Sequence, residues 1–95
     1  MSINIKSGSH RILIAEDETL IRMDLVEMLS ESGYEVVGQA SNGQEAIDLA
    51  KELKPDLAIL DVKMPILDGI SAATQIIEIS PVLMLTAFSQ KDLIE

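Results

Sequence analysis

The 95-residue sequence predicts one α/β domain built on a parallel sheet. Apolar runs of strand length alternate with segments of helical period, which is the pattern of right-handed βαβ units. The run at residues 57–60 is unbroken, as in a strand that helices cover on both faces. It ends on a carboxylate, and in open α/β sheets ligands bind outside the carboxyl ends of the strands.

The first strand is expected over residues 11–15, and three consecutive acids follow it, Glu16-Asp17-Glu18. Residues 19–32 then have helical period, and Gly33 stands where a left-handed residue would end that helix. The apolar positions expected on its inner face are Ile21, Leu25, Met28 and Leu29.

A second strand is expected over residues 34–40, followed by a turn at Ser41-Asn42-Gly43. Asn42 with Glu45 three residues later resembles a capping box, which predicts a helix from there to about Lys54. Pro55 closes that helix. Its expected apolar stripe is Ala46, Ile47, Ala50 and Leu53.

The third strand is expected over residues 56–61, and the loop 62–69 follows with Pro65 as its punctuation. A third helix should start at Asp68 or Gly69. The residues expected to face inward from it are Ile70, Ala73, Ile76 and Ile77. A fourth strand over residues 81–87 and the start of another helix from residue 89 complete the predicted elements.

Composition narrows the function classes. The formal net charge is −9, which argues against direct binding of nucleic acid or of an anionic membrane by these residues. The absence of cysteine excludes disulfides and thiolate metal sites, and no apolar run approaches the length of a membrane span. We expect a cytoplasmic protein in which residues 1–10 form a flexible arm or a tag remnant and residues 11–95 form the domain.

Polar groups follow three of the predicted strands and would meet at one edge of the sheet. They are Glu16 and Asp17 directly after the first strand, Asp61 at the end of the third and Thr86 near the end of the fourth. Clustered carboxylates repel unless a cation lies among them, and a site of hard oxygen ligands suits Mg²⁺. An aspartate beside Mg²⁺ can accept a phosphoryl group, and a nearby hydroxyl can turn that event into a side-chain movement.

Each of these residues also has an ordinary reading. An aspartate at a strand end is usually a turn former, three acids before a helix favour its dipole, and a threonine in a strand is a common β-branched residue. Only their coincidence at the ends of separate strands in one fold favours the functional interpretation.

At these residues the chain resembles the receiver domains of two-component response regulators. The matching segments are Ile12-Leu13-Ile14-Ala15-Glu16-Asp17-Glu18, Asp56-Leu57-Ala58-Ile59-Leu60-Asp61-Val62-Lys63-Met64-Pro65, Asp68-Gly69 and Leu85-Thr86-Ala87. The resemblance implies a flavodoxin-like, doubly wound parallel sheet of strand order 2-1-3-4-5. This chain ends before the segment that would supply the fifth strand, its lysine and the last helix.

The resemblance also implies roles for individual residues. Asp61 would be the phosphoacceptor, and Thr86 would be the switch hydroxyl. The Mg²⁺ site would comprise Glu16, Asp17, Asp61 and the backbone carbonyl of Lys63. A sensor histidine kinase would be the phosphoryl donor, an effector domain or partner outside this chain would supply the output, and a homodimer is compatible with the family.

Three further segments resemble the receivers that are attached to ANTAR RNA-binding domains, which act in transcription antitermination. They are Ala15-Glu16-Asp17-Glu18, Leu20-Ile21-Arg22-Met23-Asp24-Leu25 and Thr86-Ala87-Phe88-Ser89-Gln90. One spacing departs from the family: 25 positions separate Asp61 from Thr86, slightly fewer than usual, so either the third helix is trimmed or residues are missing near residues 78–81.

Two alternatives to a phosphorylated regulatory domain stay open. A pseudo-receiver would use the same fold as an interaction module without phosphate. The acid pair, Asp61 and Thr86 argue against it, whereas the missing lysine segment favours it if the chain naturally ends there. A phosphatase with an aspartate nucleophile generally needs a second acid two residues later, and that position is Lys63. The sequence therefore predicts a regulatory domain rather than an enzyme.

Overall fold

The computed structural model describes residues 10–85. Within them four strands form one parallel sheet of order β2-β1-β3-β4. The strands are β1 Arg11–Ala15, β2 Glu35–Ala40, β3 Leu57–Asp61 and β4 Val82–Leu85, and the helices are α1 Thr19–Glu31, α2 Gly43–Leu53 and α3 Gly69–Ile76. This topology confirms the flavodoxin-like arrangement. The predicted helix from residue 89 lies outside the described residues.

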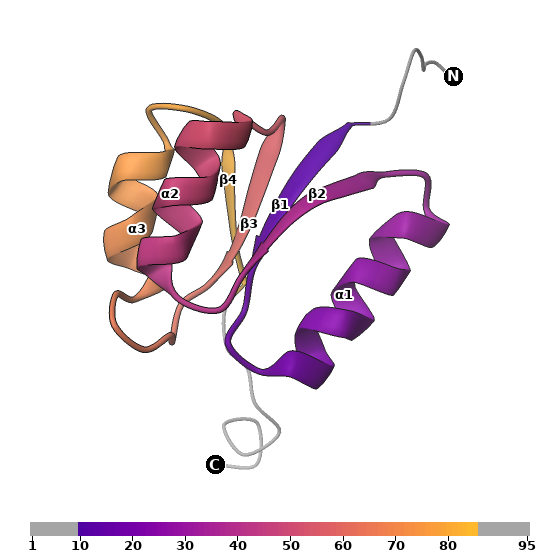
Figure 1. Ribbon diagram of the computed structural model, residues 1–95, viewed down its shortest axis with the longest axis horizontal. Helices are drawn as coiled ribbons and strands as arrows, with labels where there is room; N and C mark the ends of the chain where they lie inside the picture. The colour runs from indigo at the N-terminus through magenta and orange to yellow at the C-terminus, as the bar shows by residue number, and fades with distance from the viewer. Residues whose placement is uncertain (1–9, 86–95) are drawn as a thin grey trace.

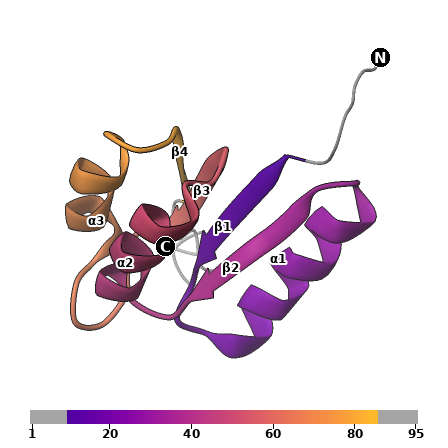
Figure 2. The ribbon, with the colours of Figure 1, turned by 45° about the horizontal axis from the view of Figure 1, so that its top comes forward.

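The sheet is covered on both faces, with α2 and α3 on one side and α1 on the other (Figure 1). Figure 2 shows the same layers after a 45° turn. Alternation along β1 divides the core, because Leu13 and Ala15 pack with α2 and α3, while Ile12 and Ile14 face α1. No helix in residues 10–85 has the length and apolar character needed to cross a membrane.

Helix α1 contacts the sheet along a narrow stripe. None of its residues is buried. The prediction that Ile21 and Met28 face inward was wrong, since their side chains are 45% and 56% exposed. Within residues 10–85 the buried core on this face is small, since it comprises Ile12, Ile14 and Ile59, and α1 reaches it through a few partly buried side chains. The α1 residues that pack against this core are Leu25, Val26 and Leu29.

Helix α3 is rotated from the expected phase. Ile70 and Ile77, predicted to face inward, are 60% and 56% exposed. The buried positions are Gly69, Ala72 and Ile76, because close packing of Gly69 sets the rotation of the helix. Adjacent positions lie about 100° away around the axis, which turns both isoleucines outward. The helix is short, and turn hydrogen bonds over residues 77–80 lead from it towards β4.

Side chains fix both ends of α2. At its start Asn42 Oδ1 accepts the backbone N–H of Glu45 at 2.8 Å, as the capping motif predicts. The Glu45 carboxylate returns to the N–H and hydroxyl of Ser41, one residue earlier than a capping box would place it. At its end the Arg11 guanidinium donates to the carbonyls of Leu53 and Lys54 at 2.8 and 3.0 Å, which ties α2 to β1.

The loop between β3 and α3 contains a strained turn. The N–H of Leu67 donates to the carbonyl of Pro65 at 2.6 Å, and the residue between them, Ile66, has φ of 69°. This is a γ-turn of the rare positive-φ kind, which is unfavourable for a β-branched residue. The Ile66 side chain is 82% exposed, so little burial offsets the strain.

Replacing Ile66 with glycine is therefore expected to stabilise the domain by about 1 kcal/mol, because glycine adopts positive φ without steric cost. For a domain of this size the melting temperature should rise by about 4–8 °C. Thermal unfolding followed by circular dichroism measures this change. Ile66→Ala is the matched control, since it removes the exposed side chain but keeps Cβ, and it should give a smaller gain. A lower melting temperature for Ile66→Gly would contradict the strain assignment.

Candidate metal centre

Three carboxylates gather at the carboxyl ends of β1 and β3. Carboxylate oxygens of Glu16, Asp17 and Asp61 all lie within 4.8 Å of one another. Glu16 and Asp17 directly follow β1, and Asp61 is the last residue of β3. Since β1 and β3 are adjacent and parallel, their ends lie at the same edge of the sheet. The structure thus brings together the three acids that the sequence placed at separate strand ends.

The three acids differ in their exposure to water. The side chains of Glu16 and Asp61 are buried, at 5% and 8% exposed, whereas Asp17 is exposed. A buried carboxylate needs hydrogen bonds or a counter-charge. One Glu16 oxygen accepts the backbone N–H of Glu18 at 3.0 Å. The cluster is therefore open to solvent on the side of Asp17 and enclosed on the side of Asp61.

Backbone hydrogen bonds hold the loop that carries Glu16 and Asp17. The N–H of Glu16 donates to the carbonyl of Ala40 at 3.0 Å, which extends the pairing between β1 and β2 past the end of β1. Glu18 is the N-cap of α1, but its side chain makes no capping hydrogen bond. The link from the Glu16 carboxylate to the Glu18 N–H instead closes the turn that leads into α1.

Two glycines allow the loop after Asp61 to fold tightly. The N–H of Gly69 donates to the carbonyl of Val62 at 2.8 Å, and a Cβ at Gly69 would collide with the backbone carbonyl of Asp61. The N–H of Gly43 donates to the carbonyl of Leu67 at 2.8 Å, and a Cβ there would collide with that carbonyl. These contacts fix the chain around Asp61 through the starts of α2 and α3.

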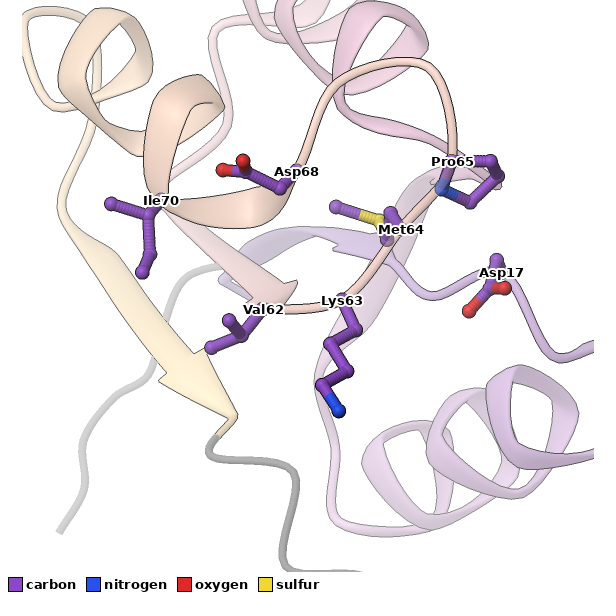
Figure 3. A pocket seen from close by; sticks show the side chains of 7 residues that line it. All are labelled: Asp17, Val62, Lys63, Met64, Pro65, Asp68 and Ile70. Atoms are coloured by element: carbon purple, nitrogen blue, oxygen red, sulfur yellow. The ribbon is translucent and has the colours of Figure 1, made fainter.

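A pocket lies beside the acid cluster (Figure 3). Asp17 reaches it from the loop after β1, and the other lining residues come from the loop after β3 and the start of α3. Lys63 is exposed there, whereas Met64 is buried in the core. The assignment of the Lys63 carbonyl as a metal ligand stays a prediction. The residues lining the pocket are Asp17, Val62, Lys63, Met64, Pro65, Asp68 and Ile70.

Thr86, the predicted switch hydroxyl, lies outside the described residues, as does its neighbour Ala87. β4 ends at Leu85, which pairs with Asp61 at the cluster end of the sheet. The role of Thr86 therefore stays a prediction.

Burial and neighbouring charge both oppose ionisation of the Glu16 carboxyl. Burial raises the pKa of the Glu16 carboxyl to about 7, although the hydrogen bond from the Glu18 N–H acts against this rise. The negative charges of Asp61 and Asp17 raise it further. A divalent cation would relieve both the repulsion and the burial cost, and carboxylate oxygens are the ligands that Mg²⁺ prefers. The donor set therefore fits a small, hard divalent cation.

Arg22, for which no sequence motif predicts a site role, contacts the loop that carries Glu16 and Asp17. Its guanidinium donates to the backbone carbonyl of Glu16 at 2.5 Å. The five-residue separation from Asp17 carries no motif that predicts this contact, because the contact depends on how α1 lies against the end of β1.

Comparisons with known proteins agree with this geometry. Residues 12–95 match the response regulator receiver domain family. The transcriptional regulatory protein PdtaR of Mycobacterium tuberculosis is 64% identical over 87 residues, which cover 90% of this chain and 42% of PdtaR. The chemotaxis protein CheY of Thermotoga maritima is 39% identical, over 88% of this chain and 72% of CheY. The chain thus spans less than half the length of PdtaR.

Solved structures show the same fold. The signal receiver domain of the response regulator NarL from M. tuberculosis aligns with a TM-score of 0.81 at 31% identity, covering 92% of this chain and 73% of that one. CheY from Borrelia burgdorferi, in a complex described as CheX-CheY-BeF3-Mg+2, aligns with a TM-score of 0.81 at 26% identity, covering 90% and 68%.

The raised pKa of Glu16 predicts how stability depends on pH without a metal. In the folded chain this carboxyl titrates near 7, against an ordinary value of 4.5. Between these values the folded state binds more protons than the unfolded state, so the free energy of unfolding falls as pH rises and levels off above about 7. From pH 5 to pH 7.5 the loss should be about 2 kcal/mol.

Melting curves in EDTA test this prediction, with Glu16→Gln as the matched variant. The variant should lose most of the slope across this window. Glu45 and Asp68 do not interfere, because hydrogen bonds from Ser41 and Ser71 lower their pKa values and their effect falls at more acidic pH. Equal slopes for the wild type and Glu16→Gln would rule out Glu16 as the cause.

Proposed function

The chain belongs to the response regulator receiver family, and from that premise we propose that it accepts a phosphoryl group on Asp61 and thereby switches an output. The observation that carries the proposal is the meeting of Glu16, Asp17 and Asp61 at one edge of the sheet. Among relatives of the same fold, the B. burgdorferi CheY structure is described with both BeF3 and Mg²⁺, which supports the proposed chemistry here.

In this proposal Asp61 is the nucleophile. One of its carboxylate oxygens forms a bond to phosphorus while the bond from phosphorus to the donor's imidazole nitrogen breaks, and the nitrogen keeps the electron pair. Glu16, Asp17, Asp61 and the Lys63 carbonyl would hold Mg²⁺. When bound, the cation supplies positive charge against the carboxylates and the phosphoryl oxygens. Thr86 would donate its hydroxyl to a phosphoryl oxygen and so report the modification.

The exposures within the cluster support this division of roles. Asp61 is buried and held by the tight loop that Gly69 permits, as a nucleophile that must keep its place requires. Asp17 is exposed on the rim of the pocket, where an entering cation would meet it first.

The proposed partners follow from the family. The donor would be a sensor histidine kinase, and the output would lie in an effector domain or in a partner protein, in the cytoplasm. We propose residues 11–95 as the receiver unit. The similarity to a transcriptional regulatory protein and the segments shared with ANTAR-type receivers support an RNA-binding antitermination output. The family is also compatible with a homodimer.

Phosphoryl uptake can be measured directly. Incubation with acetyl phosphate and Mg²⁺ should add the mass of one phosphoryl group to the intact chain, and Asp61→Asn should abolish the gain because an amide is not a nucleophile here. The matched control is Asp24→Asn, an exposed acid in the middle of α1, which should react like the wild type. Uptake by Asp61→Asn would show that another residue is the phosphoryl acceptor. In a chain of full receiver length, no uptake by the wild type would favour a phosphorylation-independent pseudo-receiver.

Mg²⁺ binding tests the ligand assignment separately. Asp17→Asn removes a proposed ligand and should weaken Mg²⁺ binding by at least about tenfold in a calorimetric titration. Glu18→Gln, an exposed neighbour outside the cluster, removes the same charge and should change the dissociation constant only slightly, by screened long-range attraction. Equal losses in the two variants would show that Asp17 acts through its charge alone.

A further inference from the structure

Arg22 connects three parts of the fold next to the acid cluster. It lies on α1, and its guanidinium donates to the backbone carbonyl of Glu16 at 2.5 Å. Its Nε donates to Oε1 of Gln39 on β2 at 3.3 Å. The side chain is half-buried between these partners. One residue thus links α1, the loop after β1 and the end of β2.

The group that Arg22 holds is the backbone carbonyl of Glu16, which is directly bonded to the nitrogen of Asp17. The Glu16 carbonyl belongs to the peptide unit that joins Glu16 to Asp17, and that unit is planar. A hydrogen bond to its oxygen fixes the rotation of the unit between the two Cα atoms. The direction in which the Asp17 side chain leaves the backbone depends on that rotation.

Within residues 10–85, few other hydrogen bonds hold this peptide in place. α1 has no buried residue and no side-chain cap at its first turn. The loop's other hydrogen bonds involve the N–H of Glu16 and the N–H of Glu18, on either side of the peptide. Within residues 10–85, the backbone carbonyl of Glu16 accepts one hydrogen bond, and Arg22 donates it.

The charge of Arg22 and its hydrogen bond to Glu16 have opposite effects on the affinity for Mg²⁺. A guanidinium close to the acid cluster repels an entering cation, so loss of this charge alone would tighten Mg²⁺ binding. Loss of the hydrogen bond to the Glu16 carbonyl would instead free the Glu16–Asp17 peptide and weaken binding. The two effects have opposite signs, which makes the role of Arg22 measurable.

We propose that Arg22 is a positioning residue that orients Asp17 for metal binding through the Glu16 carbonyl. This inference rests on the proposed function, namely that the cluster binds Mg²⁺. It assigns to α1 a part in building the site beyond covering the sheet. Gln39 is the second anchor, since it holds the guanidinium from the β2 side.

The test is a calorimetric Mg²⁺ titration of the full chain carrying Arg22→Ala. The dissociation constant should rise by about tenfold, the scale known for residues that orient metal ligands. An unchanged or lower dissociation constant for Mg²⁺ would overturn the proposal. Lys51→Ala is the matched control, because it removes one positive charge from the exposed last turn of α2 and should leave the affinity near that of the wild type.

A spectroscopic measurement separates positioning from general destabilisation. In EDTA, Arg22→Ala should shift the carbonyl ¹³C resonance of Glu16 and the amide ¹⁵N resonance of Asp17, which share one peptide unit. Resonances of α3, on the other face of the sheet, should stay unchanged. Shifts spread through the whole domain, or none at Glu16 and Asp17, would contradict the assignment.

Two further variants keep the outcomes distinct. If Arg22→Ala is unfolded at the titration temperature, Arg22→Lys replaces it, since an ammonium keeps the charge but not the planar fork that serves both acceptors, and binding should weaken by about threefold. A wild-type affinity for Arg22→Lys would then overturn the proposal. Asp17→Asn serves as the reference: a wild type without saturable Mg²⁺ binding refutes the proposed function, whereas loss in Asp17→Asn but not in Arg22→Ala refutes only this inference.

Discussion

Repulsion between carboxylates at one edge of the sheet is the constraint on which this structure depends. Glu16, Asp17 and Asp61 lie within 4.8 Å of one another, and two of them are buried. Without a cation this arrangement costs stability: burial raises the pKa of the Glu16 carboxyl, and the negative charges of Asp61 and Asp17 raise it further. The rest of the fold has to hold the acids together against this repulsion, and the same stored repulsion favours a cation when one is available.

The backbone supplies most of the restraint. β1 and β3 pair along four residues of each strand, which brings their carboxyl ends together. Gly69 lets the loop after β3 press against the Asp61 carbonyl, and Gly43 at the start of α2 accommodates the same loop at Leu67. The strained turn at Ile66 lies within this loop, where the surrounding contacts hold the backbone in an unfavourable conformation.

The two faces of the sheet contribute differently to this support. The face under α2 and α3 holds most of the buried apolar residues, whereas α1 rests on a few residues of β1 and β3. The loop with Glu16 and Asp17 leads directly into the less buried helix. Two of the clustered acids therefore lie in different surroundings, because Asp61 is buried at the end of β3 whereas Asp17 is exposed in the loop that leads into α1.

The sequence by itself determined the order of the elements, the cap at Asn42 and the placement of acids at the ends of β1 and β3. These features depend on local periodicity and on the chemistry of neighbouring residues, so they are readable without a structure. Only the tertiary structure decided that Ile21, Met28, Ile70 and Ile77 face solvent, that burial raises the pKa of Glu16 and that Arg22 reaches the Glu16 carbonyl. Each of these depends on how helices sit on the sheet, and helical period alone gives the width of an apolar face but not which line of it meets the core.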